Sequence, residues 1–180
     1  AEAAFGIFSV SRYHCNGGMK ISEYYCRSKY QLQVCSGPYY ISIINDNGTT
    51  DEQSFSNDIA GILLKNITEE SFSPDRFFPE GVSEEAMKGA VVVRGALGVF
   101  NGIPSLSGTF EGAAGYTAMV VRHESQTLVS LRFDTEDGIK LYSDAQKINR
   151  DVLLRGEESA MGSGSVASMI CLQHLLIKVD

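Results

Sequence analysis

Hydrophobic and polar residues alternate over several stretches of the chain, and a period of two residues is typical of half-buried β-strands. The alternation predicts strands over residues 5–11, 30–35, 39–44, 116–122 and 127–133. The last two surround the polar run 123–126 and therefore predict a β-hairpin. The valine-rich segment 90–94 is expected to be a central strand, and a short strand is expected at 139–142.

The C-terminal stretch 166–179 is apolar at most positions, which suits either a helix or a strand buried on both faces. We predict a strand from about Met169, because Cys171, Leu175 and Ile177 then share one face. A loop over 156–165 is expected to precede it.

Three segments have helical character. Thr50 and Gln53 form a capping-box pattern ahead of a helix from about Asp51 to Lys65. The apolar positions of that helix recur at helical spacing and are Phe55, Ile59, Ile62 and Leu63. Ser83 is expected to cap a short turn that ends at Gly89, and Ser143 with Gln146 predicts a capping box before a helix that ends at Gly156.

Two further stretches are expected to lack regular structure. The proline-containing segment 71–81 is predicted to be a loop that anchors Phe77 and Phe78 in the core, an aromatic lid over a pocket being the alternative. The glycine-rich segment 95–115 is expected to supply bulges and tight bends beside strands. Together these elements predict one globular domain over residues 1–180. Its fold class is mostly β (α+β by content), an antiparallel barrel or sandwich with two or three short helices.

One motif within the glycine-rich segment is familiar. Gly108, Phe110, Gly112, Ala113 and Gly115 match the pattern Gly-x-Phe-x-Gly-Ala-x-Gly. This stretch resembles a hairpin of the dirigent and allene oxide cyclase-like barrel superfamily. The resemblance implies an eight-stranded barrel, often trimeric, whose apolar cavity steers cyclisation or radical coupling. It implies no catalytic residue, because no position outside the hairpin matches.

Composition narrows the range of functions. The chain has 180 residues, a net charge of −7 and 43% hydrophobic residues, which suits one globular domain. The acidic balance argues against nucleic acid as a partner. No apolar run reaches the roughly 20 residues of a membrane span.

Cysteines and glycosylation sequons bear on the compartment. Cys15, Cys26, Cys35 and Cys171 lack the paired spacing of zinc ligands, and they permit two disulfides in any of three connectivities, or four buried thiols. Asn47 and Asn66 each begin an N-x-Thr sequon. The first residues, Ala1-Glu2-Ala3-Ala4, resemble the start of a processed chain. Together these features favour a secreted glycoprotein, and a cytoplasmic protein is the alternative.

Catalytic signals are weak. Glu111 and Glu124 are candidate acids, and His123 is a candidate base that could complete a triad with Ser163 and Asp134. Cys15 or Cys35 could instead pair with His123 as a thiol nucleophile. Two looser motifs are better explained by ordinary structure. Gly162–Ala167 matches a dinucleotide fingerprint but is expected to be a loop. Asp134–Gly138 begins like a calcium-binding loop but is expected to be a turn. We therefore expect neither a cofactor nor a metal.

Aromatic residues are the remaining candidates for a binding site. Tyr30, Tyr40, Phe110 and Tyr116 are predicted to line an apolar cavity. The leading hypothesis is a secreted protein that binds a small apolar molecule, or a protein or glycan partner, and that could form homo-oligomers. A cofactor-free cyclase or coupling-type enzyme is the first alternative, and an adhesin, lectin or capsid-like module is the second.

Overall fold

The computed structural model describes residues 1–12, 15–16, 20–78, 82–123, 125–154, 157–161, 164–171 and 173–179. The chain divides into two compact units, Ala1–Ser73 and Pro74–Asp180, which are called the N-terminal and C-terminal units. Each is described by itself. The expectation of a single domain over residues 1–180 stays a prediction.

The N-terminal unit has the order helix, three strands, helix. Its elements are α1 (Glu2–Ser11), β1 (Tyr24–Arg27), β2 (Gln31–Ser36), β3 (Tyr39–Ile44) and α2 (Thr50–Leu64). The strands form an antiparallel sheet in the order β1-β2-β3, with Val34 paired to Tyr25 on one side and Ile41 on the other. The predicted strands at 30–35 and 39–44 and the predicted helix at 51–65 are confirmed.

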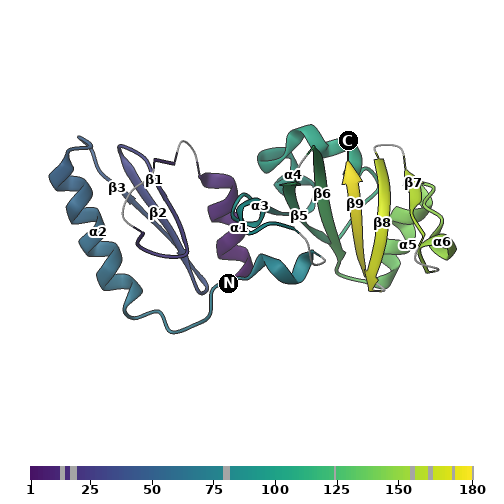
Figure 1. The fold of residues 1–180 in the computed structure, drawn as a ribbon, viewed down its shortest axis with the longest axis horizontal. Coiled ribbons are helices and arrows are strands. Elements are labelled where there is room, and N and C mark those ends of the chain that lie inside the picture. Colours follow the sequence, from purple (N-terminus) through teal and green to yellow (C-terminus); the bar gives the residue numbers. More distant parts are fainter. Residues whose placement is uncertain are drawn as a thin grey trace. The chain divides into compact units, whose positions relative to one another are not determined.

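The two helices cover opposite faces of this sheet (Figure 1). Leu32 and Val34 pack against Ala60 of α2 on one face. On the other face, Gln33 Nε2 donates a hydrogen bond of 3.0 Å to the carbonyl of Ser11, the last residue of α1. Alternate residues of β2 therefore serve two different layers, as the pleat requires.

The predicted strand at 5–11 is wrong, because this segment is helix α1. Phe5 and Ile7 suggested alternation, but Ile7 is exposed and the buried side chains are Ala4, Phe5, Phe8 and Ser9. That spacing of three and four residues belongs to a helix. Phe5 packs on Tyr24 and Phe72, with ring centroids 4.9 and 4.8 Å apart, so aromatic packing decides the conformation.

The C-terminal unit contains a larger antiparallel sheet flanked by short helices. Its elements are η1 (Pro74–Phe77), α3 (Glu84–Lys88), β4 (Val91–Arg94), α4 (Gly95–Gly102), η2 (Pro104–Phe110), β5 (Tyr116–His123), β6 (Gln126–Phe133), α5 (Glu136–Ala145), α6 (Arg150–Leu154), β7 (Ser159–Met161), β8 (Gly164–Cys171) and β9 (His174–Val179). The strand order is β4-β5-β6-β9-β8-β7, and every pair is antiparallel. The predicted hairpin of 116–122 and 127–133 is confirmed as β5 and β6.

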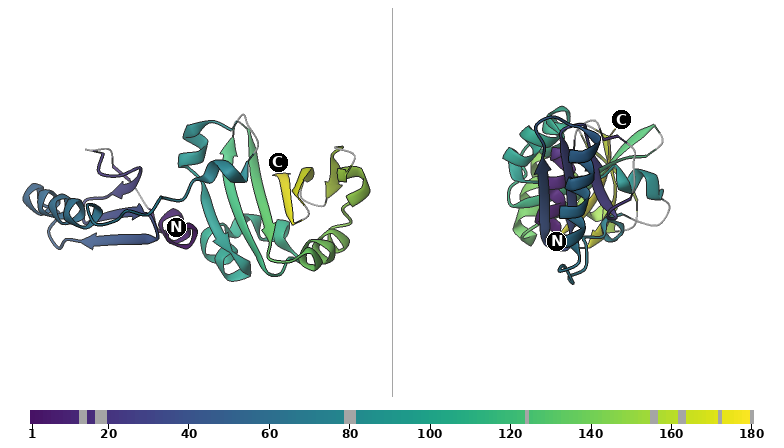
Figure 2. Two further views of the ribbon diagram at one scale, coloured as in Figure 1. Left: turned by 90° about the horizontal axis from the view of Figure 1, so that it is seen from below. Right: turned by 90° about the vertical axis from the view of Figure 1, so that its left-hand side faces the viewer.

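The overall class is α+β with two antiparallel sheets. Within the described residues the larger sheet is open rather than a closed barrel, since β4 and β7 stand at its two ends (Figure 2). The helices are more numerous than the two or three expected. Segment 90–94 was expected to be central and is instead the edge strand β4, because it pairs on one side only, with β5.

One face of the larger sheet carries a core of aromatic rings. Phe110 of η2 stacks on Tyr116, with centroids 5.5 Å apart, and Phe133 contacts Tyr142 of α5 at 5.4 Å. The Tyr142 hydroxyl donates a 2.5 Å hydrogen bond to the carbonyl of Thr109. Burial, with a smaller contribution from Tyr116, raises the pKa of Tyr142 well above its ordinary value, so the phenol stays protonated. These contacts hold η2 and α5 over the sheet.

Several segments of this unit differ from their predicted structure. Residues 95–102 and 104–110 form the helices α4 and η2, where glycine-rich bends beside strands were expected. The dirigent-like resemblance stays a prediction. Segment 139–142 lies in α5, which Thr135 caps by accepting a hydrogen bond from the Gly138 amide at 3.1 Å. The predicted capping box at Ser143 therefore falls near the end of a helix. Residues 164–171 and 174–179 form two strands, β8 and β9, where one strand from about Met169 was expected. Strand β7 and the start of β8 fall in the segment 156–165, which was expected to be a loop.

Other expectations for this unit are met. Phe77 and Phe78 are both buried, as predicted for anchors in the core. Ser83 caps α3 by accepting from the Ala86 amide, and Gly89 ends that helix.

Candidate functional site

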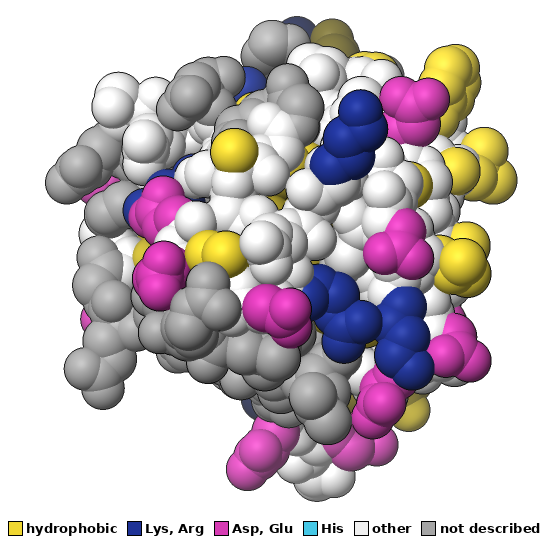
Figure 3. Space-filling view, turned by 90° about the vertical axis from the view of Figure 1, so that its right-hand side faces the viewer, with side chains coloured by type: hydrophobic (Ala, Val, Ile, Leu, Met, Phe, Trp, Pro, Cys, Tyr) yellow, Lys and Arg dark blue, Asp and Glu magenta, His cyan; other side chains and the backbone are white. Residues whose placement is uncertain are grey.

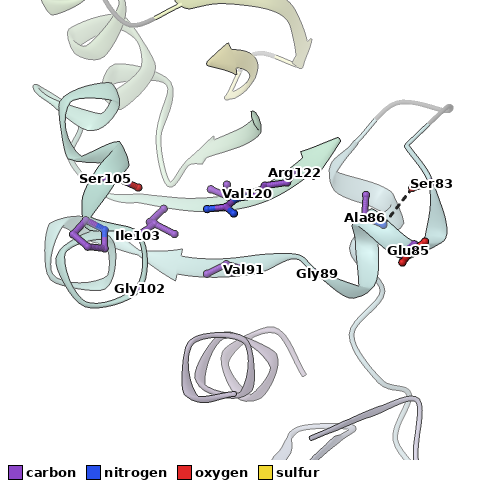
Figure 4. Close-up of a pocket in the computed structure, with 11 residues that line it drawn as sticks. Ser83, Glu85, Ala86, Gly89, Val91, Gly102, Ile103, Ser105, Val120 and Arg122 are labelled. Carbon is purple, nitrogen blue, oxygen red and sulfur yellow. Dashed lines mark hydrogen bonds between the residues drawn. The ribbon is translucent and has the colours of Figure 1, made fainter. Parts of the chain in front are cut away.

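The C-terminal unit has a groove of about 620 Å³ over the β4–β5 end of its sheet. Helix α3 and the following Gly89 form one wall, and the connection from α4 to η2 forms the other (Figure 4). A volume of this size lies within the range of small-molecule sites. The described lining residues fall between 83 and 122, within the C-terminal unit.

Local sequence explains both walls. Ser83 starts α3 and Gly89 ends it, so this wall is one short capped helix. At the other wall, the Ile103 amide donates a hydrogen bond to the Val99 carbonyl and so ends α4. Pro104 begins η2, because the first residues of a helix need no N–H donor. Ile103 is thereby buried against the floor of the groove.

The floor is apolar except for one cation. Val91 of β4 pairs with Val120 of β5, so both side chains lie on the same face of the sheet. Arg122 follows two residues later on β5 and points to that face as well. In Figure 4 the nitrogen atoms of Arg122 lie beside Val120, over the floor. Ser83, Glu85 and Ser105 complete a polar rim.

The charge of Arg122 is not neutralised by the protein in the described part of the chain. Arg122 is exposed and forms no ion pair with a described carboxylate. Arg94, one strand away, is different, because its guanidinium lies 3.1 Å from a carboxylate oxygen of Asp134. A guanidinium stays charged at all working pH values and binds carboxylate or phosphate through paired hydrogen bonds. Arg122 is therefore the residue of the groove best suited to hold an oxyanion.

Sequence reasoning missed this groove. Arg122 was recognised only as the end of a strand, and the walls come from a segment that was expected to be irregular. The usable signals were the Ser83 cap and the alternation that places Val120 and Arg122 on one face.

The four aromatic residues predicted to bind ligand do not gather at the groove. Phe110 and Tyr116 are buried against each other in the core of the C-terminal unit. Tyr30 and Tyr40 lie in the N-terminal unit, where Tyr30 is exposed beside the Lys29 ammonium and Tyr40 is half-buried on β3. None of the four is a lining residue of the groove. A binding role for them stays a prediction.

The candidate catalytic residues are not brought together by the described structure. Glu111 is exposed at the end of η2, where its carbonyl accepts a 2.8 Å hydrogen bond from Gln146. Glu124, Ser163 and the side chain of His123 lie outside the described residues. Asp134 binds Arg94 rather than a histidine.

A buried serine–histidine pair was also missed. Ser130 of β6 forms a hydrogen bond through its hydroxyl to Nε2 of His174 on β9, and Phe77 packs edge-on against the imidazole at 6.1 Å. Burial, and secondarily the positive charge of Arg132, lowers the pKa of His174 to about 4. His174 is 6% exposed, so this pair supports the fold rather than an open site.

Cysteine pairing is partly resolved. Cys15 and Cys26 form a disulfide that ties the chain after α1 to β1. Cys35 is a buried free thiol, and burial raises its pKa to about 11. The side chain of Cys171 and residue His14 lie outside the described residues.

Both sequon asparagines are exposed. Asn47 Nδ2 donates a 2.8 Å hydrogen bond to Glu52, and Asn66 Nδ2 donates a 2.9 Å hydrogen bond to the Ile62 carbonyl. Gly48 has φ +62°, and Thr49 is the helix cap, so the first sequon also has a complete explanation as a turn and cap.

Further searches of the described residues give two negative findings. Nowhere in these residues do three or more His, Cys, Asp or Glu side chains gather closely enough to hold a metal ion. No described helix has the length and apolar character needed to cross a membrane.

Comparisons with models of known families, with curated proteins and with solved structures find no match to this chain. No family resemblance therefore adds a site residue to those placed by the geometry.

Proposed function

We propose that the chain is a binding protein whose C-terminal unit holds a small amphipathic oxyanion in the groove between α3 and η2. The observation that carries the proposal is Arg122, an exposed guanidinium without a described carboxylate partner, placed over an apolar floor. A carboxylate or phosphate head group would pair with Arg122, and an alkyl or aryl body would cover Val91, Val120 and Ile103. This keeps the expectation of a small, largely apolar ligand and adds the charge of its head group.

The distribution of polar groups supports an amphipathic rather than a wholly apolar ligand. The rim offers hydroxyls from Ser83 and Ser105 and a carboxylate from Glu85 at the α3 wall. The hydroxyls can donate to the anionic head group, whereas the Glu85 carboxylate repels it and so favours its place at Arg122. Val91, Val120 and Ile103 remove the apolar surface of the ligand from water.

The test compares four ligands that share one chain length. Octanoate and octyl phosphate are titrated into the protein by isothermal calorimetry, beside octanol and octylammonium. We expect saturable binding of both anions and at least tenfold weaker binding of octanol and octylammonium. Binding of all four with similar affinity, or of none, would overturn the proposal.

Two arginine variants form a matched pair for this test. Arg122→Gln is expected to weaken octanoate binding at least tenfold, because one charge-assisted pair is typically worth more than 1.4 kcal/mol. Arg94→Gln removes another exposed guanidinium, on the opposite face of the sheet, and should leave affinity unchanged. Equal losses in both variants would point to unspecific attraction of anions.

We also propose secretion and N-glycosylation at Asn47 and Asn66. The disulfide and the exposure of both asparagines support this proposal, since disulfides persist in oxidising compartments and glycans need surface positions. Intact mass before and after an amidase that removes N-glycans tests it, and an unchanged mass for protein from its natural source would overturn it.

A further inference from the structure

Apart from Leu64 at its end, which packs on the sheet, helix α2 turns its large apolar side chains away from the sheet that it covers. Phe55 and Ile62 are 66% and 63% exposed, Leu63 is also exposed, and Ile59 is only half-buried. The buried positions of the helix are instead Ser56 and Ala60, which are small. An ordinary surface helix has the opposite arrangement, with its large apolar side chains toward the core.

The exposed apolar residues form a continuous stripe. Phe55, Ile59 and Ile62 stand at positions i, i+4 and i+7, which lie above one another on one helix face. This spacing is the one by which helices contact partner helices or grooves. We call Phe55, Ile59 and Ile62 the α2 stripe.

A row of negative charge runs beside the stripe. Asp51 and Asp58 are seven residues apart, and each precedes a stripe residue by four, so the two carboxylates flank it along its length. Both are exposed, and neither forms an ion pair with a described residue. The only other acid of the helix, Glu52, is held in the capping box with Thr49. Hydrogen bonds from the Asn47 side chain, and secondarily from Thr49, lower the pKa of its carboxyl.

The charges discriminate between possible occupants of the stripe. Helix α2 carries Asp51, Glu52 and Asp58, and the only cation at its ends is Lys65 at the C-cap, so two copies of α2 packed together would still bring together more carboxylates than cations. A partner with cations beside its own apolar face would instead pair with Asp51 and Asp58. Charge complementarity therefore favours a basic partner over a second copy of the chain.

We propose that the α2 stripe is a docking surface for a basic amphipathic helix of a protein partner. The apolar face of that helix packs on Phe55, Ile59 and Ile62, and its lysine or arginine side chains pair with Asp51 and Asp58. The surface lies in the N-terminal unit and is independent of the oxyanion groove.

The test uses a fluorescein-labelled 18-residue peptide of leucine and lysine in a helical amphipathic pattern, and a second peptide with glutamate in place of lysine. Fluorescence anisotropy with the intact protein is expected to give saturable binding of the lysine peptide and at least tenfold weaker binding of the glutamate peptide. The double variant Asp51→Asn, Asp58→Asn should abolish this preference. Equal binding of both peptides, or no saturable binding, would overturn the proposal.

Helix α4 supplies a matched control, because Leu97 and Phe100 are 73% and 72% exposed without flanking carboxylates in that helix. The double variant Phe55→Ala, Ile62→Ala should weaken binding of the lysine peptide at least tenfold. The double variant Leu97→Ala, Phe100→Ala should leave that binding unchanged. Circular dichroism checks that each variant folds, which is expected for exposed positions. Equal loss of peptide binding in both double variants contradicts the proposal. So does a dimer seen by ultracentrifugation, or binding to phosphatidylcholine vesicles, that is lost in Phe55→Ala, Ile62→Ala.

Discussion

At the scale of single residues, His174 links protonation to folding in the acidic pH range. Its pKa is about 4 in the folded chain, against an ordinary value of 6.5, because burial and Arg132 disfavour the imidazolium. The unfolded chain therefore takes up this proton first as the pH falls. The contribution of His174 to stability is complete above about pH 6.5, decreases from there to pH 4, and changes no further below pH 4.

This linkage gives a measurable pH dependence. Between pH 7 and pH 5 the free energy of unfolding should fall by about 2 kcal/mol from His174 alone. In His174→Gln, which keeps a polar side chain beside Ser130 but does not titrate, this part of the decrease should vanish. Urea unfolding at both pH values measures it, with His123→Gln as the control. A decrease of the same size in His174→Gln as in the unmodified chain would show that another group is responsible.

Sequence alone could not have singled out His174. It was one histidine in an apolar run, and its environment depends on Ser130, 44 residues earlier, and on Phe77 from η1. Arg122 was hidden for the same reason, since its neighbours in the groove come from α3 and η2. Residues whose chemistry is set by distant neighbours need the register of the sheet before they can be recognised.

At the scale of elements, the start of α2 shows how close a sequence prediction can come. A capping box was expected at Thr50 and Gln53, and the structure has it one residue earlier, at Thr49 and Glu52. Both pairs satisfy the motif, and the turn decides between them because Gly48 at positive φ directs Thr49 into the cap position. Gln53 instead donates to the Gly48 carbonyl at 3.2 Å.

The cap can be tested with neighbouring threonines. Thr49→Ala should lower the free energy of unfolding by about 1 kcal/mol, since it leaves the Glu52 amide without its acceptor. Thr50→Ala, inside the first turn, should cost almost nothing. Both are compared by urea unfolding in protein without glycans, because Thr49→Ala also removes a sequon. A larger loss from Thr50→Ala would place the cap where the sequence pattern suggested.

Hydrophobic periodicity predicted an element correctly where its apolar residues are the ones that face the core. It found β2, β3, β5 and β6, whose alternating side chains meet cross-strand partners. It mistook α1 for a strand because Phe5 and Ile7 both look like inward residues, although only Phe5 is buried. It found α2 for an unexpected reason, since the apolar residues that revealed the helix form its outward stripe.

At the scale of the whole molecule, the two units have separate sheets and separate cores. The aromatic cluster of Phe5, Tyr24 and Phe72 lies within the N-terminal unit, and that of Phe110, Tyr116 and Phe133 lies within the C-terminal unit. Sequence patterns gave no boundary between them, because residues 71–81 contain neither a charge block nor a low-complexity linker. A short proline-containing connection between compact units looks like any surface loop.

The Cys15–Cys26 disulfide offers a way to separate the stabilities of the two units, since it lies entirely within residues 1–73. Removing it with Cys15→Ser, Cys26→Ser should lower the free energy of unfolding of the N-terminal unit by about 3 kcal/mol, because a cross-link over a loop of this length restricts the unfolded chain by that amount. Hydrogen exchange followed by mass spectrometry should then show faster exchange in β2 and β3, while β5 and β6 keep their protection. Equal loss of protection in both sheets would mean that the units unfold together, as expected of the single domain inferred from the sequence. Loss confined to β2 and β3 would make each unit its own cooperative element, so that a partner docked on α2 could stabilise one without altering the groove of the other.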